Sequence, residues 1–461
     1  MLADVITTID QASKMTAKHA SPSRREALFI LNIFSRTLSP LPLILRNRDW
    51  QGDFTNRDKR LITELVNGTL RWQIQLDWIL RQFVHGQFAE LPLSIQNILR
   101  LSLYQLRQLN QVPDYAVVDE AGILAREFHE IKYARLVNGV LRNYLRNQHH
   151  LQFPRTADDQ LAALAIGYAF PRWQVELLVE QYGSERTASI LDQLNQRPNL
   201  TIRINTEKIS VAEFYQQLEK REISFSLSKF LPEFVSLEEK AGTIQELPGF
   251  DEGWFFIQDV SAGFVAHLTA PQPDQQIAEI CAAPGGKLTH VAQLRRDQGI
   301  ILGMDISRSR LAITAENIRR LGYQSIRLLQ GDARRLPHRQ MDMIVIDAPC
   351  SGLGTIRKNP DIKLRRKPED LPAVQQLQLQ ILIAAAERLK PHGSVIYSTC
   401  TINKEENERI IAQFIHKQPQ FKIEPISSFL ILHGISAQDW LSILPDQDSL
   451  DGSFCVRLRK D

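Results

Sequence analysis

Two apolar stretches, MDMIVIDAPC (Met341–Cys350) and GSVIYSTC (Gly393–Cys400), decide the fold. Each is a short β-branched run, typical of a buried strand, and each ends in polar residues and a cysteine. Three similar runs, QIAEICA, GIILGMDI and IRLLQGDA, come before them, and helical patterns such as Ser309–Gly322 separate the runs. This alternation predicts a doubly wound, mostly parallel α/β sheet. The terminal runs FKIEPISSF and GSFCVRLRK are expected to close one edge, the last strand running antiparallel.

The rest of the chain predicts two more domains. Between about Ser23 and Arg146, apolar residues recur every three or four positions, which indicates helices. The segment LVNGTLR (65–71) is echoed by LVNGVLR (136–142), and because glycine destabilises a helix, the echo predicts two close helix approaches. Short helices then alternate with short strands. We therefore expect a helical domain over residues 1–150, a small α+β domain over 151–255 and the α/β domain over 256–461.

Composition excludes several classes of protein. The chain has 461 residues, of which 43% are hydrophobic and 23% charged, as in an ordinary globular protein. It has no apolar run of about 18 residues and no leader pattern, so we expect a cytoplasmic protein without a membrane partner. Its four cysteines lie far apart without a CxxC pair, so we expect no metal site and no disulfide framework.

Charge is informative only locally. The net charge is +3, which is weak evidence for a polyanionic partner. However, RKNPDIKLRRK (Arg357–Lys367) carries six Lys or Arg against one Asp, directly after the first cysteine strand. A solvated surface loop is the plain interpretation of such a run. Its place beside a strand end favours a loop that meets nucleic-acid phosphates.

Strand ends also predict a cofactor site. The loop CAAPGGK follows the first strand of the sheet, and its small residues let the backbone approach a ligand. Asp305 and Asp332 end the next two strands, where they could bind ribose hydroxyls and an adenine amine. Either one alone could be a turn residue or helix cap. Without a GxGxxG or Walker motif, the pattern suits S-adenosylmethionine. The candidate binding residues are Cys281, Ala282, Ala283, Pro284, Gly285, Gly286, Lys287, Asp305, Asp332 and Asp347.

The segments CAAPGGKLTH, GMDIS, QGDARRLP, DAPCSGLGTIRKNPDIK and YSTCTINKEENE resemble the motifs of the RNA cytosine-5 methyltransferases. The resemblance covers nearly the whole chain, and the helical part resembles the all-α, RNA-binding NusB domain. It implies a Rossmann-like, S-adenosylmethionine-dependent methyltransferase domain and an RNA partner. The expected activity is methylation of C5 of cytosine 967 in 16S rRNA. Thr401 stands where close relatives often have Ser, and both residues keep a hydroxyl.

Cytosine chemistry explains why two cysteines are needed. C5 becomes nucleophilic only after a nucleophile adds to C6, and a thiolate can add and later leave. The sequence offers Cys400, Cys350 and Asp347 for this chemistry. The resemblance implies that Cys400 attacks C6, that Cys350 assists proton removal and product release, and that Asp347 contacts the cytosine. DNA cytosine-5 methyltransferases attack with the Pro-Cys cysteine instead, and the YSTC cysteine, which they lack, favours Cys400.

Two other functions remain open from the sequence. The chain could be a NusB-like RNA-binding factor whose sheet domain has lost activity, although its intact cysteines and aspartates argue against this. It could also keep the chemistry but act on tRNA or on another rRNA. The remaining cysteines have plainer expected roles, Cys455 as a packed core residue and Cys281 as backbone in the cofactor loop.

Overall fold

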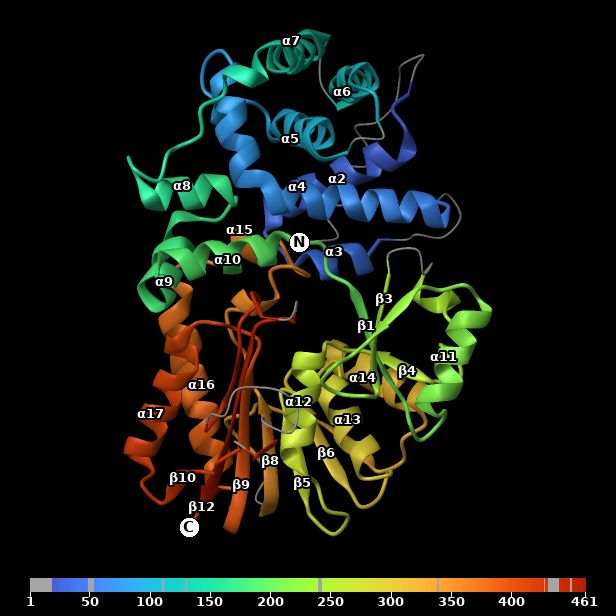
Figure 1. Ribbon diagram of the computed structural model, residues 1–461, viewed down its shortest axis with the longest axis vertical. Helices are drawn as coiled ribbons and strands as arrows, with labels where there is room; N and C mark the ends of the chain where they lie inside the picture. Colours follow the sequence, from blue (N-terminus) through green and yellow to red (C-terminus); the bar gives the residue numbers. More distant parts are fainter. Residues whose placement is uncertain are drawn as a thin grey trace. The chain divides into compact units, whose positions relative to one another are not determined.

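The protein is described by a computed structural model that covers residues 19–48, 54–109, 112–128, 131–238, 243–337, 340–426, 428–429, 439–447 and 450–461. The chain forms two compact units (Figure 1). The helical unit contains the residues up to Asn195 together with Asn359–Lys367. The sheet unit contains Gln196–Lys358 and Pro368–Asp461.

The helical unit confirms the predicted helical N-terminal region. Its longest helix, α4, begins at a capping box in which Thr55 and Asp58 exchange side-chain and backbone hydrogen bonds. Buried Leu, Ile and Phe side chains of the first six helices pack into one core. The helices are α2 (Pro22–Thr37), α3 (Leu41–Arg46), α4 (Asn56–Phe83), α5 (Leu93–Gln108), α6 (Asp114–Phe128), α7 (Ile131–Asn147), α8 (Gln160–Gly167), α9 (Arg172–Tyr182) and α10 (Ser184–Asn195), with the short α15 (Ile362–Arg365) inserted from later in the chain.

The two echoed glycines behave differently. A Cβ at Gly68 in α4 would overlap the ring of Tyr104 in α5, so these helices approach as closely as predicted. Gly139 in α7 is exposed, and a Cβ there would meet no atom within 4 Å. The second predicted close approach is therefore wrong at Gly139, because that position faces outward while Val137 and Val140 of the same helix are buried.

The sheet unit begins with a small antiparallel sheet of order β2-β3-β1-β4. One face of this sheet is covered by α11, which begins at a capping box between Ser210 and Glu213 (Figure 1). Ile202, Phe214 and Phe255 are fully buried between the helix and the sheet. The elements are β1 (Leu200–Ile204), α11 (Val211–Lys220), β2 (Phe225–Leu227), β3 (Phe234–Leu237) and β4 (Phe255–Ile257). They confirm the predicted α+β pattern in this part of the chain, whereas α8, α9 and α10, which were expected in the same domain, belong to the helical unit.

The larger sheet has the order β10-β12-β9-β8-β5-β6-β7, with β11 paired to β12. Strands β5 to β9 run parallel, and β12 runs antiparallel to both β9 and β10, as predicted. The strands are β5 (Ile277–Ile280), β6 (Ile301–Asp305), β7 (Ile326–Gln330), β8 (Met341–Asp347), β9 (Leu389–Thr399), β10 (Phe421–Ile423), β11 (Leu441–Ile443) and β12 (Ser453–Lys460). The helices are α12 (Val260–Thr269), α13 (Gly286–Leu294), α14 (Arg308–Leu321), α16 (Asp370–Ala386) and α17 (Glu408–Lys417).

The basic segment Arg357–Lys367 is not the free loop that the sequence predicted. Lys363 is 1% exposed, and its ammonium donates to Asn195 Oδ1 at 2.6 Å inside the helical unit. It also donates to the backbone carbonyls of Arg71 and Ala169. The prediction was wrong at this residue because the buried acceptors come from parts of the chain distant in sequence. No helix in the described residues is both long and apolar enough to cross a lipid bilayer.

Candidate active site

The sheet brings the two predicted cysteines together. Strands β8 and β9 are parallel neighbours, with Asp347 in register with Ser398, so their carboxyl ends lie side by side. Cys350 and Cys400 follow these ends, and their Sγ atoms are 3.3 Å apart. Both thiols are partly exposed. By contrast, Cys455 is fully buried within β12, as the sequence predicted.

The surroundings of the two thiols make them unequal. The hydrogen bond with Cys350 lowers the pKa of Cys400, and the positive charge of Lys287 acts in the same direction, although burial and Asp347 oppose it. The same hydrogen bond, reinforced by burial, raises the pKa of Cys350 well above its usual range. Only the thiolate is an effective nucleophile. These pKa directions favour a thiolate at Cys400 over one at Cys350.

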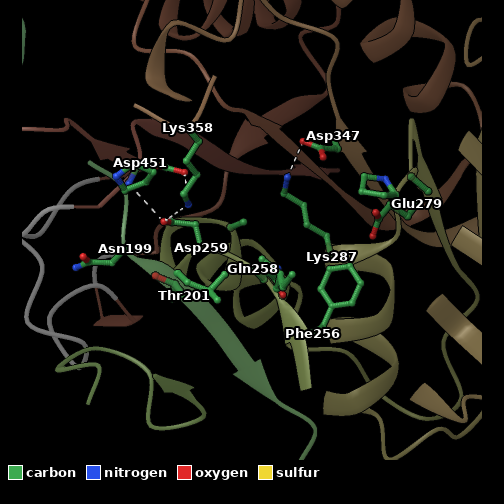
Figure 2. Close-up of a pocket in the computed structure, with 17 residues that line it drawn as sticks. Asn199, Thr201, Phe256, Gln258, Asp259, Glu279, Lys287, Asp347, Lys358 and Asp451 are labelled. Carbon is green, nitrogen blue, oxygen red and sulfur yellow. Dashed lines mark hydrogen bonds and ion pairs between the residues drawn. The ribbon is translucent and has the colours of Figure 1, made fainter. Parts of the chain in front are cut away.

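Lys287 has a role that the sequence interpretation did not find. It was expected only as part of the cofactor loop, but its Nζ lies 2.6 Å from Asp347 Oδ1 (Figure 2). Lys287 is the second residue of α13, and its side chain is 12% exposed. The ammonium of Lys287 favours a thiolate at Cys400, whereas the carboxylate of Asp347, which is 33% exposed, opposes it. In the sequence, the only indication of this role was the basic residue at the end of the loop CAAPGGK.

We expect Lys287→Gln to shift the pH dependence of Cys400 alkylation by iodoacetamide to higher pH. Loss of the ammonium removes a charge that favours the thiolate, so the pKa of the thiol rises. Methyl transfer should fall by about 10²-fold, as when a preorganised electrostatic group is removed. Lys390→Gln is the matched control, because Lys390 pairs with Asp342 at 2.8 Å at the opposite end of β8. If the rate of alkylation depended on pH in the same way in the wild type and in Lys287→Gln, the role of Lys287 would be contradicted.

A cavity of about 460 Å³ lies beside this ion pair (Figure 2). Part of its wall comes from the cofactor loop and β8, namely Ala282, Pro284, Gly286, Lys287 and Asp347. Cys281, Ala283, Gly285, Asp305 and Asp332 do not line it. The small sheet and the residues that follow it contribute Phe256, Gln258 and Asp259. None of these three was a sequence candidate.

Two buried polar atoms in the cavity wall lack a hydrogen-bond partner among the described residues. One is Glu279 Oε2 in β5, and the other is Gln258 Nε2. Burial and the charge of Asp347 raise the pKa of Glu279 well above its usual range. Such atoms are costly unless a ligand or water satisfies them. The sequence did carry a signal for Glu279, an acidic residue within the apolar run QIAEICA.

Lys358 closes another part of the cavity wall. Its Nζ lies 2.7 Å from Asp259 Oδ2 and 2.7 Å from Asp451 Oδ2 (Figure 2). Arg357 is buried and pairs with Asp451 at 3.2 Å. The first two cations of the predicted phosphate-contacting segment are therefore already neutralised by carboxylates, which corrects that prediction further.

The other cofactor candidates lie around the loop after β5. Asp305 is 3% exposed and accepts from the backbone N–H groups of Ala283, at 3.2 Å, and Ser307, at 2.9 Å. It thus orients the loop as well as ending its strand. Asp332 instead pairs with Arg334 at 2.6 Å, and those hydrogen bonds lower its pKa to about 2.

Cys281 begins the cofactor loop with a positive φ of 59°. Burial raises the pKa of its thiol to about 12, which makes it a poor nucleophile. Gly285 also has a positive φ, 97°, and a Cβ there would lie 2.8 Å from Cγ2 of Thr314. This loop therefore requires glycine at that position.

One further cluster has the residue types of a metal site. Glu233 Oε1 lies 2.6 Å from Nε2 of His267 and 3.2 Å from Nε2 of His290. Two ligand atoms on one tetrahedral zinc ion are about 3.3 Å apart, given bonds of about 2.0–2.1 Å. The 2.6 Å between Glu233 Oε1 and His267 Nε2 is the length of a direct hydrogen bond. The three side chains therefore form a hydrogen-bonded cluster in this structure.

Comparison with known proteins agrees with these features. Models of three families match: the NusB family over residues 25–146, the ferredoxin-like domain of RsmF/B-like methyltransferases over 170–243, and 16S rRNA methyltransferase RsmB/F over 266–459. A Proteus mirabilis protein named ribosomal RNA small subunit methyltransferase B is 36% identical over 416 residues, 89% of this chain and 92% of that protein.

Solved structures share the fold. The crystal structure of PH0851 superposes with a TM-score of 0.78 at 24% identity, covering 96% of this chain and all of that one. NSun6 from Pyrococcus horikoshii, solved with SFG, an analogue of S-adenosylmethionine, has a TM-score of 0.56 and 25% identity, covering 64% of this chain and 99% of that one. With a NusB domain and a ferredoxin-like domain ahead of its catalytic domain, the chain belongs to the RsmB/F family of rRNA methyltransferases.

Proposed function

We propose that this protein, in the cytoplasm, transfers the methyl group of S-adenosylmethionine to C5 of a cytosine in 16S rRNA, at the position numbered 967. The observation that carries the proposal is the pair of thiols 3.3 Å apart, with the pKa of one lowered and that of the other raised. The name of the Proteus relative supports the small-subunit rRNA substrate. Within this proposal, residues 1–150 bind RNA, residues 151–255 form a small α+β domain whose strand β1 lines part of the cavity, and residues 256–461 carry the chemistry.

S-Adenosylmethionine, when bound, supplies an electrophilic methyl group. The loop from Cys281 to Lys287, together with Asp305, Asp332 and Asp347, would hold it. The structure fits such a ligand, because Gly286 lines the cavity without a side chain and Glu279 presents an unsatisfied oxygen to it. The ligand's ammonium or hydroxyl groups could satisfy that oxygen.

The first chemical step belongs to Cys400. Its thiolate forms a bond to C6 of the cytosine, and the electron pair of the C5–C6 bond makes C5 nucleophilic. Asp347, held by Lys287, ends the neighbouring strand β8 and contacts the polar edge of the base. Because a duplex would hide C5 and C6 within its stack, the cytosine must be unpaired or turned outward.

The last step belongs to Cys350. Once Cys400 is bonded to C6, its thiolate charge no longer raises the pKa of Cys350. Cys350 can then give its proton to solvent water and, as a thiolate, take the remaining hydrogen of C5 as a proton. The electrons of that C–H bond restore the C5–C6 double bond, and the Cys400 thiolate leaves.

Methyl transfer from labelled S-adenosylmethionine tests the function. We expect incorporation into 16S rRNA and not into 23S rRNA or tRNA, with bisulfite sequencing placing the methyl group on cytosine 967. Incorporation into tRNA or 23S rRNA alone would keep the chemistry and overturn the substrate. No incorporation into any RNA, alongside tight RNA binding, would favour the inactive NusB-like factor.

A further inference from the structure

A buried carboxylate, that of Glu406, contacts the residue that follows each of the two cysteines. Glu406 ends the short helical turn η5 (Lys404–Glu406) and is fully buried. Its Oε2 accepts from the backbone N–H of Ser351 at 2.7 Å, and its Oε1 accepts from the hydroxyl of Ser351 at 2.5 Å. Ser351 is the residue that follows Cys350. Glu406 therefore holds both the backbone and the side chain next to one thiol.

The same carboxylate holds the neighbour of the other thiol. The hydroxyls of Ser351 and Thr401 lie 2.8 Å apart, and Thr401 Oγ1 lies 3.4 Å from Glu406 Oε1. Asn403 Nδ2 donates to Glu406 Oε1 at 3.1 Å. Thr401 follows Cys400, so its hydroxyl connects the two cysteine loops. This contact explains why either Thr or Ser would serve at position 401.

Donors occupy both oxygens of the carboxylate. Besides the groups already named, Gln378 Nε2 donates to Glu406 Oε2 at 3.2 Å and to the carbonyl of Pro349 at 2.9 Å. A buried charge is tolerated only when its hydrogen-bonding capacity is filled. A backbone hydrogen bond from Gly354 to the carbonyl of Cys400 further ties the two loops together.

We propose that Glu406 is a positioning residue that sets the separation of the Cys350 and Cys400 thiols, a role that rests on the proposed two-cysteine chemistry. The carboxylate does not touch either sulfur. It acts through Ser351 and Thr401, which fix the backbone beside each cysteine. Reacting atoms must be held closely, and a displacement of about 1 Å can cost about a hundredfold in rate.

Glu406→Gln is the variant that tests this proposal. Each carboxylate oxygen accepts from at least one N–H group, so either orientation of an amide places its N–H₂ against another N–H donor. Phenylarsine oxide, which bridges two neighbouring thiols, reports their separation without RNA or methyl transfer. We expect Glu406→Gln to bind it about tenfold more weakly, because bridging requires both thiols in place. We also expect kcat to fall about a hundredfold with an unchanged KM for S-adenosylmethionine.

Glu405→Gln is the matched control, since Glu405 is adjacent in sequence, is exposed and pairs only locally with Arg409 at 3.3 Å. Ser351→Ala is a smaller change that keeps the backbone N–H, and it carries the test if Glu406→Gln does not fold. It should weaken arsenical binding in the same direction. The proposal would be overturned if a folded variant kept both its arsenical affinity and its kcat within twofold of wild type. It would also be overturned if kcat fell only in proportion to the fraction of folded protein. A weakened arsenical complex in a protein that methylates no RNA would instead overturn the proposed function alone.

Discussion

Cys400→Ala is expected to abolish methyl transfer, with a loss of about 10⁴-fold or more, because no other group in the site can add to C6. Cys350 cannot replace it, because burial and the charge of Glu406 still raise the pKa of that thiol after the hydrogen bond to Cys400 is lost. The variant should also form no covalent complex with RNA. Methyl incorporation under single-turnover conditions and denaturing gels of protein with labelled RNA measure both effects.

The control for this variant is Cys455→Ala. It removes a sulfur from the same sheet, but from a buried position in β12 outside the site. Activity per folded molecule should stay near that of wild type. If Cys400→Ala retained methyl transfer while Cys455→Ala lost it, the assigned nucleophile would be wrong.

Cys350→Ala is expected to have the opposite signature, an accumulation of the covalent adduct. Cys400 can still attack and C5 can still be methylated, but the remaining hydrogen of C5 is removed slowly, so the thiolate cannot leave. The adduct should survive denaturing electrophoresis and be far more abundant than in the wild type. An adduct that persists in Cys400→Ala and is missing in Cys350→Ala would reverse the two roles, as in DNA cytosine-5 methyltransferases.

Much of the fold could be predicted because its signals are local. The apolar runs that end at Asp305 and Asp347 are buried along most of their length and have helices between them, and parallel strands leave their carboxyl ends at one edge. Cys350 and Cys400 could therefore be expected to meet, although 50 positions separate them. The capping box of α11 is also a local signal, because Ser210 and Glu213 are only three residues apart.

The remaining features depend on contacts between distant parts of the chain, which no local pattern encodes. Lys363 lies within a basic run that looks solvated, yet its acceptors come from Asn195 and other residues of the helical unit. Glu406 looks like one of several acidic residues at a helix start, yet it is fully buried against Ser351. Gly139 repeats the sequence around Gly68, but only Gly68 meets a neighbouring helix.

The most direct test of the central claim is to identify the sulfur that bonds to RNA. RNA carrying 5-fluorocytidine at the target position should trap the adduct, because fluorine replaces the hydrogen that must leave C5. After digestion of the protein and the RNA, mass spectrometry should find the modified nucleotide on the peptide that contains Cys400. A modified nucleotide on the peptide that contains Cys350 would contradict the account.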